Sequence, residues 1–139
     1  MFVPDFVLDA SITLSWAFED ESTVEADAVL ERLRTEKAVV PPIWAFEVTN
    51  GLIVAERKGR IGATDTSDFL RLLKQLPILT DPTLCGFIWE DLAQLARETN
   101  LSAYDASYLY LAKLRGLPLA TLDRLLAQAA KSHGVAVLP

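Results

Sequence analysis

The 139-residue sequence predicts a single three-layer α/β/α domain with a central parallel sheet. Short runs of β-branched and other apolar residues alternate with longer amphipathic segments, which is typical of strands joined by crossover helices. No linker or internal repeat interrupts this alternation, and a chain of this length can close one hydrophobic core. We therefore expect one domain that spans residues 1–139.

Five short apolar runs predict the strands of this sheet. Each run is bounded by residues such as proline, aspartate or glycine, which commonly end strands. The predicted strands lie within residues 5–10, 37–40, 77–80, 117–123 and 135–139. Pro41 and Pro42 end the second of them, because proline supplies no backbone N–H for a sheet ladder.

The segments between these runs predict helices. The first helix begins near Ser11, and the segment 22–37 opens with a capping box of Ser22 and Glu25. The helix that follows the two prolines ends near Gly59, and a further helix is capped near Thr64. The remaining helices are expected within residues 64–76, 84–100, 101–113 and 124–134.

Composition and charge exclude several classes of function. No apolar run approaches the ~20 residues that span a bilayer, and no basic region precedes the first apolar run, so we expect no membrane segment. The single cysteine, Cys85, cannot form an internal disulfide and suits the cytoplasm, where it would be a small buried side chain. The net charge of −6 opposes non-specific attraction to nucleic acid, so a polyanionic substrate would need local basic groups or cations.

Four acidic residues occupy positions where a ligand site is expected. Asp9 and Asp123 end predicted strands, whereas Glu47 and Asp105 stand in the first turns of predicted helices. In an open α/β sheet, the carboxyl ends of the strands and the starts of the helices that follow them share one edge. The topology therefore predicts that these four carboxylates converge.

Each acid also has an ordinary structural interpretation. Asp105 could complete a capping box with Ser102, Glu47 could favour the dipole at its helix start, and Asp123 could be an N-cap. Asp9 ends an apolar strand, so its carboxylate must have partners if it is buried. The four acids together are stronger evidence for a ligand site than any one of them alone.

Carboxylates brought close together repel one another unless a cation lies among them. Such oxygen ligands suit Mg²⁺ or Mn²⁺, whereas zinc prefers histidine and cysteine ligands. The only histidine, His133, lies near the end of the last predicted helix, which excludes a Ser-His-Asp triad. A carboxylate-bound cation of this kind activates water and neutralises charge on a phosphodiester.

Three stretches together resemble PIN-domain ribonucleases of the VapC type, the toxins of toxin–antitoxin pairs. They are VLDASITLSWAF, WAFEVTNGLIVAERKGRI and LSAYDASYLYLAKLRGLPLATLDRLLAQAAKSHGV. The resemblance runs from about Phe6 to Val137. It implies that the catalytic and metal-binding residues are Asp9, Glu47, Asp105 and Asp123, and that the supporting polar residues are Ser11, Asn50 and Thr121.

The resemblance also implies a PIN-like fold, a Mg²⁺- or Mn²⁺-dependent endoribonuclease activity, a homodimer, and inhibition by a cognate VapB-type antitoxin. RNA phosphates need basic contacts that position the strand without reading bases. The exposed basic residues proposed for that role are Arg57, Lys58, Arg60, Arg124, Lys113 and Arg115. Trp16, Trp44 and Trp89 are expected to serve packing or an antitoxin groove in preference to stacking on RNA bases.

Two alternatives belong to other classes. An aspartyl-phosphate phosphatase could use Asp9 as its nucleophile, but no lysine stands in the position that this chemistry requires, and Glu47 would have no role. A non-catalytic interaction module would use the acids only to cap helices. That module predicts no stabilisation by divalent metal.

Overall fold

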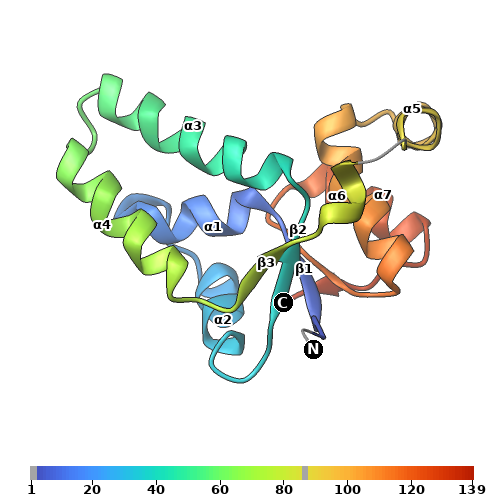
Figure 1. Ribbon diagram of the computed structural model, residues 1–139, viewed down its shortest axis with the longest axis horizontal. Coiled ribbons are helices and arrows are strands. Elements are labelled where there is room, and N and C mark those ends of the chain that lie inside the picture. The colour runs from blue at the N-terminus through green and yellow to red at the C-terminus, as the bar shows by residue number, and fades with distance from the viewer. Residues whose placement is uncertain (1–2, 86–87) are drawn as a thin grey trace.

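The computed structural model describes residues 3–85 and 88–139, and within them five parallel strands form one sheet in the order β3-β2-β1-β4-β5 (Figure 1). The strands are β1 (Phe6–Leu8), β2 (Ala38–Val40), β3 (Ile78–Thr80), β4 (Leu119–Ala120) and β5 (Val137–Leu138). The chain builds outward from β1 to β3 and then returns to the other side of β1. The strand order therefore reverses between β1 and β4, which is where open α/β sheets bind ligands.

Helices connect these strands and cover the sheet. They are α1 (Ala10–Ala17), α2 (Val24–Arg32), α3 (Ile43–Arg57), α4 (Ala63–Lys74), α5 (Trp89–Thr99), α6 (Ala103–Arg115) and α7 (Arg124–Ser132). Two short 3-10 turns, η1 (Glu19–Glu21) and η2 (Pro82–Cys85), complete the described elements. Figure 1 shows α3 and α4 side by side at one side of the sheet and α5, α6 and α7 grouped at the other. No helix of the described residues is long and apolar enough to cross a bilayer.

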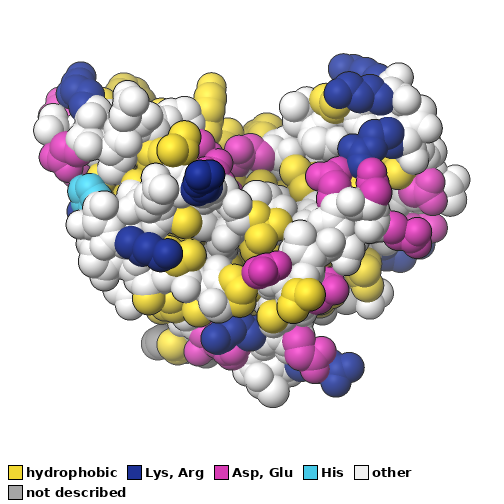
Figure 2. Space-filling model, turned by 180° about the vertical axis from the view of Figure 1, so that it is seen from behind, with side chains coloured by type: hydrophobic (Ala, Val, Ile, Leu, Met, Phe, Trp, Pro, Cys, Tyr) yellow, Lys and Arg dark blue, Asp and Glu magenta, His cyan; other side chains and the backbone are white. Residues whose placement is uncertain are grey.

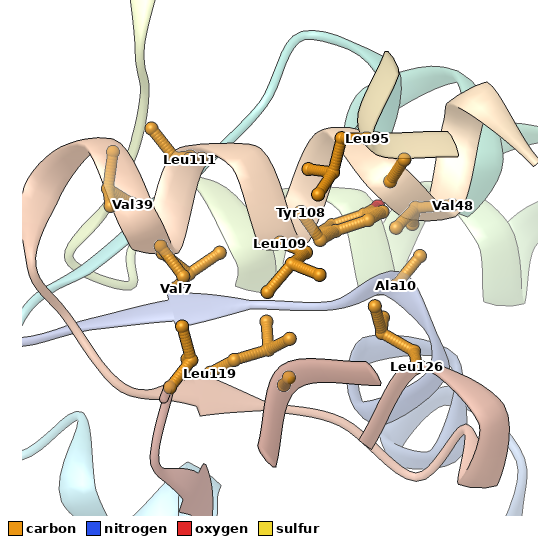
Figure 3. Packing of buried hydrophobic residues seen from close by; sticks show 14 of the residues in the cluster. Val7, Ala10, Val39, Val48, Leu95, Tyr108, Leu109, Leu111, Leu119 and Leu126 are labelled. Atoms are coloured by element: carbon orange, nitrogen blue, oxygen red, sulfur yellow. The ribbon is translucent and has the colours of Figure 1, made fainter. Parts of the chain in front are cut away.

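Side chains of one strand alternate between two hydrophobic clusters, and this alternation produces the three layers. Phe6 and Leu8 of β1 pack with residues of α1 and α2, among them Val29. Val7 points to the opposite face, where it packs with Leu109 of α6 and Leu119 of β4 (Figure 3). Both faces of the strand are fully buried, as expected for a parallel sheet covered by helices. The predicted fold class is therefore confirmed.

Two predicted helix starts are wrong by one or two residues. Helix α2 is capped by Thr23, whose Oγ1 accepts a hydrogen bond of 2.9 Å from the N–H of Ala26. Ser22 instead closes the preceding turn η1, where its N–H donates to the carbonyl of Glu19. Helix α4 begins at Ala63, where the Asp65 carboxylate accepts the N–H of Gly62.

Several predicted elements are shorter than expected. The helix predicted over 84–100 begins only at Trp89, after η2; Gly86, Phe87 and the side chain of Cys85 lie outside the described residues. The strand predicted over 117–123 is limited to Leu119–Ala120. It ends there because the next N–H groups bind side-chain hydroxyls instead of a neighbouring strand: the N–H of Leu122 donates to Ser11 Oγ, and that of Asp123 to Thr121 Oγ1.

Candidate active site

Asp9 follows β1 directly and is the N-cap residue of α1. Its side chain is only 4% exposed, so its carboxylate needs hydrogen-bond partners. Oδ2 accepts two of them, from Ser11 Oγ at 2.6 Å and from Thr121 Oγ1 at 2.7 Å. Ser11 and Thr121, both predicted as supporting residues, therefore hold Asp9 in one orientation. Burial raises the pKa of Asp9 and outweighs the lowering effect of these two hydroxyls.

Glu47 stands in the first part of α3, the helix that begins directly after Pro41 and Pro42. The glutamate side chain is half-buried, and its Oε1 accepts a hydrogen bond of 2.6 Å from the hydroxyl of Tyr108. Burial raises the pKa of Glu47, the Tyr108 hydrogen bond opposes this rise, and the negative charges of Asp9 and Asp105 add to it.

Asp105 and Asp123 begin helices α6 and α7, and both also take part in helix capping. The N–H of Asp105 donates to Ser102 Oγ at 3.1 Å, and Asp123 Oδ1 accepts the N–H of Leu126 at 3.0 Å. Asp123 is thus the N-cap of α7, as its ordinary interpretation predicts. Capping engages one oxygen of Asp123, and Ser102 interacts with both the N–H and the carboxylate of Asp105.

The four carboxylates share one electrostatic environment at the edge where strand order reverses. The charges of Asp105 and Asp123 raise the pKa of Asp9, and the charge of Asp123, after burial, raises that of Asp105. None of the ion pairs among the described residues involves these acids. In residues 3–85 and 88–139, no three metal-ligating side chains stand close enough to surround an ion as they are placed. Figure 2 shows a hollow between two lobes of the molecule, with acidic side chains beside it.

The other predicted site residues differ in how they are placed. Asn50 is exposed on α3, close to one turn beyond Glu47. Arg57, Lys58 and Arg124 are also exposed, so they are accessible to a phosphate backbone. Their role in RNA binding stays a prediction.

Two of the basic residues proposed for RNA already have acidic partners. The Arg60 guanidinium binds Asp20 at 3.0 Å and Glu21 at 2.8 Å, and it lies 4.5 Å above the ring centre of Phe18. Arg115 binds the buried carboxylate of Asp81 at 2.7 Å. Contact with RNA would require these side chains to leave existing partners.

The sequence analysis gave Tyr108 no place at the site. The side chain of Tyr108 is completely buried. Its hydroxyl nevertheless reaches Glu47 on another helix. The signal was present in the sequence, because Tyr108 follows Asp105 by three residues on one helical face, and a buried tyrosine hydroxyl needs a partner.

Comparison with known proteins agrees with this fold. The family model "PIN domain" matches residues 6–132, which contain all four carboxylates. The chain therefore belongs to the PIN-domain family.

Individual relatives are of the VapC type, as the sequence resemblance implied. The chain is 33% identical over 129 residues to "VapC ribonuclease Mb0985" of Mycobacterium bovis, covering 91% of this chain and 92% of that protein. It is 34% identical over 90 residues to "Exonuclease VapC9" of Pyrobaculum aerophilum, covering 64% of each.

Solved structures show the same fold. PAE2754 from Pyrobaculum aerophilum superposes with a TM-score of 0.71 at 28% identity, over 96% of this chain and 83% of that one. FitAcB from Neisseria gonorrhoeae superposes with a TM-score of 0.63 at 21% identity, over 96% of both chains. The second likeness is one of fold alone.

Proposed function

We propose that this protein is a Mg²⁺- or Mn²⁺-dependent endoribonuclease that acts as the toxin of a toxin–antitoxin pair. The observation that carries the proposal is the set of four carboxylates near the strand-order reversal. Burial and neighbouring negative charge raise the pKa of Asp9, Glu47 and Asp105, and no ion pair among the described residues involves any of the four acids. The names of the VapC relatives support ribonuclease as the activity.

The residues present fit a divalent cation. The donors are carboxylate oxygens supported by hydroxyls, which are the ligands that Mg²⁺ and Mn²⁺ prefer. Asp9, Glu47 and Asp105 would hold the cation, and Asp123, with one oxygen engaged by Leu126, would contribute its other oxygen directly or through water. When bound, the cation supplies an activated water and neutralises charge on the attacked phosphate.

The chain's own residues prepare this site. Ser11 and Thr121 fix the Asp9 carboxylate before any ligand arrives, so this carboxylate needs little reorganisation on binding, whereas the other acids must move closer to surround an ion. The raised pKa values of Asp9, Glu47 and Asp105 show that their ionised forms are disfavoured in the metal-free protein. A bound cation would oppose that shift and keep the carboxylates ionised as its ligands.

The first test is thermal unfolding in chelator, Mg²⁺ and Mn²⁺ of the wild type and of Asp105→Asn. A ligand that binds only the folded state raises the unfolding midpoint, so the wild type should gain stability with metal and the variant should gain much less. In chelator, Asp105→Asn should be as stable as the wild type or more so. The raised pKa of Asp105 means that its ionised carboxylate destabilises the folded wild type at neutral pH, and the variant lacks that carboxylate. An equal response of both proteins to metal would contradict the assignment.

The mode of cleavage needs a separate substrate. The relatives carry both "ribonuclease" and "exonuclease" in their names, so a linear RNA does not distinguish the two activities. A circular single-stranded RNA has no ends, and an endoribonuclease linearises it whereas an exonuclease leaves it intact. We expect linearisation in Mg²⁺ by the wild type and none by Asp9→Asn.

The proposal includes a cytoplasmic homodimer inhibited by a VapB-type antitoxin. An antitoxin segment that brings a basic side chain to the carboxylates would compete with the cation for the same negative charge. Inhibition by such a segment should therefore weaken as Mg²⁺ concentration rises, which a titration of cleavage activity at several metal concentrations would measure.

A further inference from the structure

The completely buried Tyr108 hydroxyl lies between elements that carry three of the four carboxylates. Tyr108 belongs to α6 and follows Asp105 by one turn. Its hydroxyl donates to Glu47 Oε1 on α3 at 2.6 Å, and it also interacts with the backbone amide of Ala10, the residue after Asp9. Figure 3 shows the ring between Leu95 and Leu109 with its oxygen directed toward Val48, the neighbour of Glu47.

The surrounding packing gives this hydroxyl little freedom. The Tyr108 side chain is among the largest completely buried ones and belongs to the main hydrophobic cluster, with Leu109, Val48 and Leu95. A close-packed protein interior holds an aromatic ring in one orientation. The position of the hydroxyl is therefore set by the core and does not depend on the solvent-exposed edge of the site.

The Tyr108 hydroxyl meets a specific need of Glu47. Glu47 is half-buried, and a carboxylate in that position is stabilised by a donor. Replacing the phenol by a benzyl side chain would leave this carboxylate without that donor.

We propose that Tyr108 is a positioning residue that fixes the orientation of the Glu47 carboxylate relative to Asp9 and so presents it to the cation. The proposal deepens the proposed function and rests on it. Partners that orient metal ligands typically contribute about 10-fold to 100-fold to metal affinity or activity, although they never touch the ion.

The test compares Tyr108→Phe with Tyr110→Phe in the full chain. Both changes remove one hydroxyl from α6, but Tyr110 lies on the side of that helix that faces α5, where it lines a surface pocket with Asp91 and Gln94. Isothermal titration with Mg²⁺ alone measures the metal affinity of the chelator-treated proteins. We expect Tyr108→Phe to lose about 10-fold to 100-fold in affinity and Tyr110→Phe to match the wild type.

Kinetics add a second readout. Because the hydroxyl acts on a cation-holding group and not on RNA, Tyr108→Phe should lower kcat for RNA cleavage by about 10-fold or more with little change in KM. In a Glu47→Gln background, the same substitution should have almost no further effect on kcat, because the group through which it acts is already altered. Additive losses in the two backgrounds would overturn the proposal.

The remaining outcomes are also distinguishable. If the wild type shows no affinity for Mg²⁺ or Mn²⁺, the proposed function and this inference fail together. If the wild type binds metal and Tyr108→Phe binds it equally well, only this inference fails. Should Tyr108→Phe not fold, a structure of the wild type with Mn²⁺ decides the matter: the Tyr108–Glu47 hydrogen bond supports the proposal when it persists and overturns it when it is broken.

Discussion

At the scale of single residues, Asp81 shows that a buried acid of this protein can have a purely structural role. Asp81 follows β3 and is completely buried. Its Oδ1 accepts the N–H and the hydroxyl of Thr83, and its Oδ2 accepts the Arg115 guanidinium at 2.8 Å. Burial alone would raise the pKa of Asp81, but these hydrogen bonds together with the charge of Arg115 outweigh burial and lower it. The pKa values of Asp9, Glu47 and Asp105 shift in the opposite direction, which separates these three carboxylates from Asp81.

The lowered pKa of Asp81 predicts a defined dependence of stability on pH. A carboxylate whose pKa is lower in the folded state stabilises the fold above its unfolded pKa of about 3.9, and this contribution is lost as pH falls through the lowered value. We expect Asp81→Asn to reduce the free energy of unfolding at pH 7 by about 1–3 kcal/mol, because its partners lose a charged acceptor. The difference should shrink below about pH 4. Urea unfolding of the wild type and of Asp81→Asn at pH 7 and below about pH 4 measures the difference in their free energies of unfolding. An equal difference at both pH values would contradict a stabilising ion pair between Asp81 and Arg115.

At the scale of elements, the contact between α1 and α3 brings two of the acids together. Gly51 lies on α3 one turn after Glu47 and faces Leu14 of α1. A Cβ at Gly51 would come within 2.7 Å of Leu14 Cδ2, closer than carbon atoms normally approach. The absence of a side chain at position 51 therefore leaves room for the end of the Leu14 side chain in the contact between α1 and α3.

This contact leads to a prediction about stability and metal response together. Gly51→Leu should reduce the free energy of unfolding by about 1–3 kcal/mol, because added carbons overfill the interface between the two helices. It should also reduce the rise in unfolding midpoint with Mg²⁺, because Glu47 moves away from Asp9. Thr49→Leu adds a comparable side chain on the exposed face of the same helix and should change neither quantity. Thermal unfolding of both variants with and without Mg²⁺ measures their stability and the rise in unfolding midpoint. A rise equal to that of the wild type in Gly51→Leu would contradict this role for the contact between α1 and α3.

At the scale of the whole molecule, the net charge of −6 predicts that RNA binds weakly at the proposed site unless a cation is held there. Long-range repulsion between an acidic protein and a polyanion weakens binding, whereas a cation held by the carboxylates lowers the local negative charge and offers a positive centre to a phosphate oxygen. We expect the affinity for a short single-stranded RNA to fall by about tenfold, or about 1.4 kcal/mol, when Mg²⁺ is replaced by chelator. Fluorescence anisotropy at matched ionic strength measures this, since screening by salt is then constant. Equal affinity in both conditions would remove the metal-bridged mode of binding.

Much of this fold and of its candidate site could be predicted from local patterns. Strand and helix positions follow from short-range periodicity and from breakers such as Pro41 and Pro42, which act within a few residues. The placement of Asp9 and Asp123 near one sheet edge follows from parallel topology alone. The choice of Thr23 over Ser22 as the cap of α2 could not be predicted, because both residue types are good caps and only the structure shows that Ser22 closes η1.

The sequence by itself determined a parallel α/β domain of the PIN family and the four acids at its strand and helix ends, because each depends on neighbours in the chain. Only the tertiary structure decided what holds those acids. The Tyr108 hydroxyl reaches Glu47 across 61 positions, and the Thr121 hydroxyl reaches Asp9 across 112. Contacts over such separations arise from the packing of helices on the sheet, and no local pattern encodes which hydroxyl meets which carboxylate.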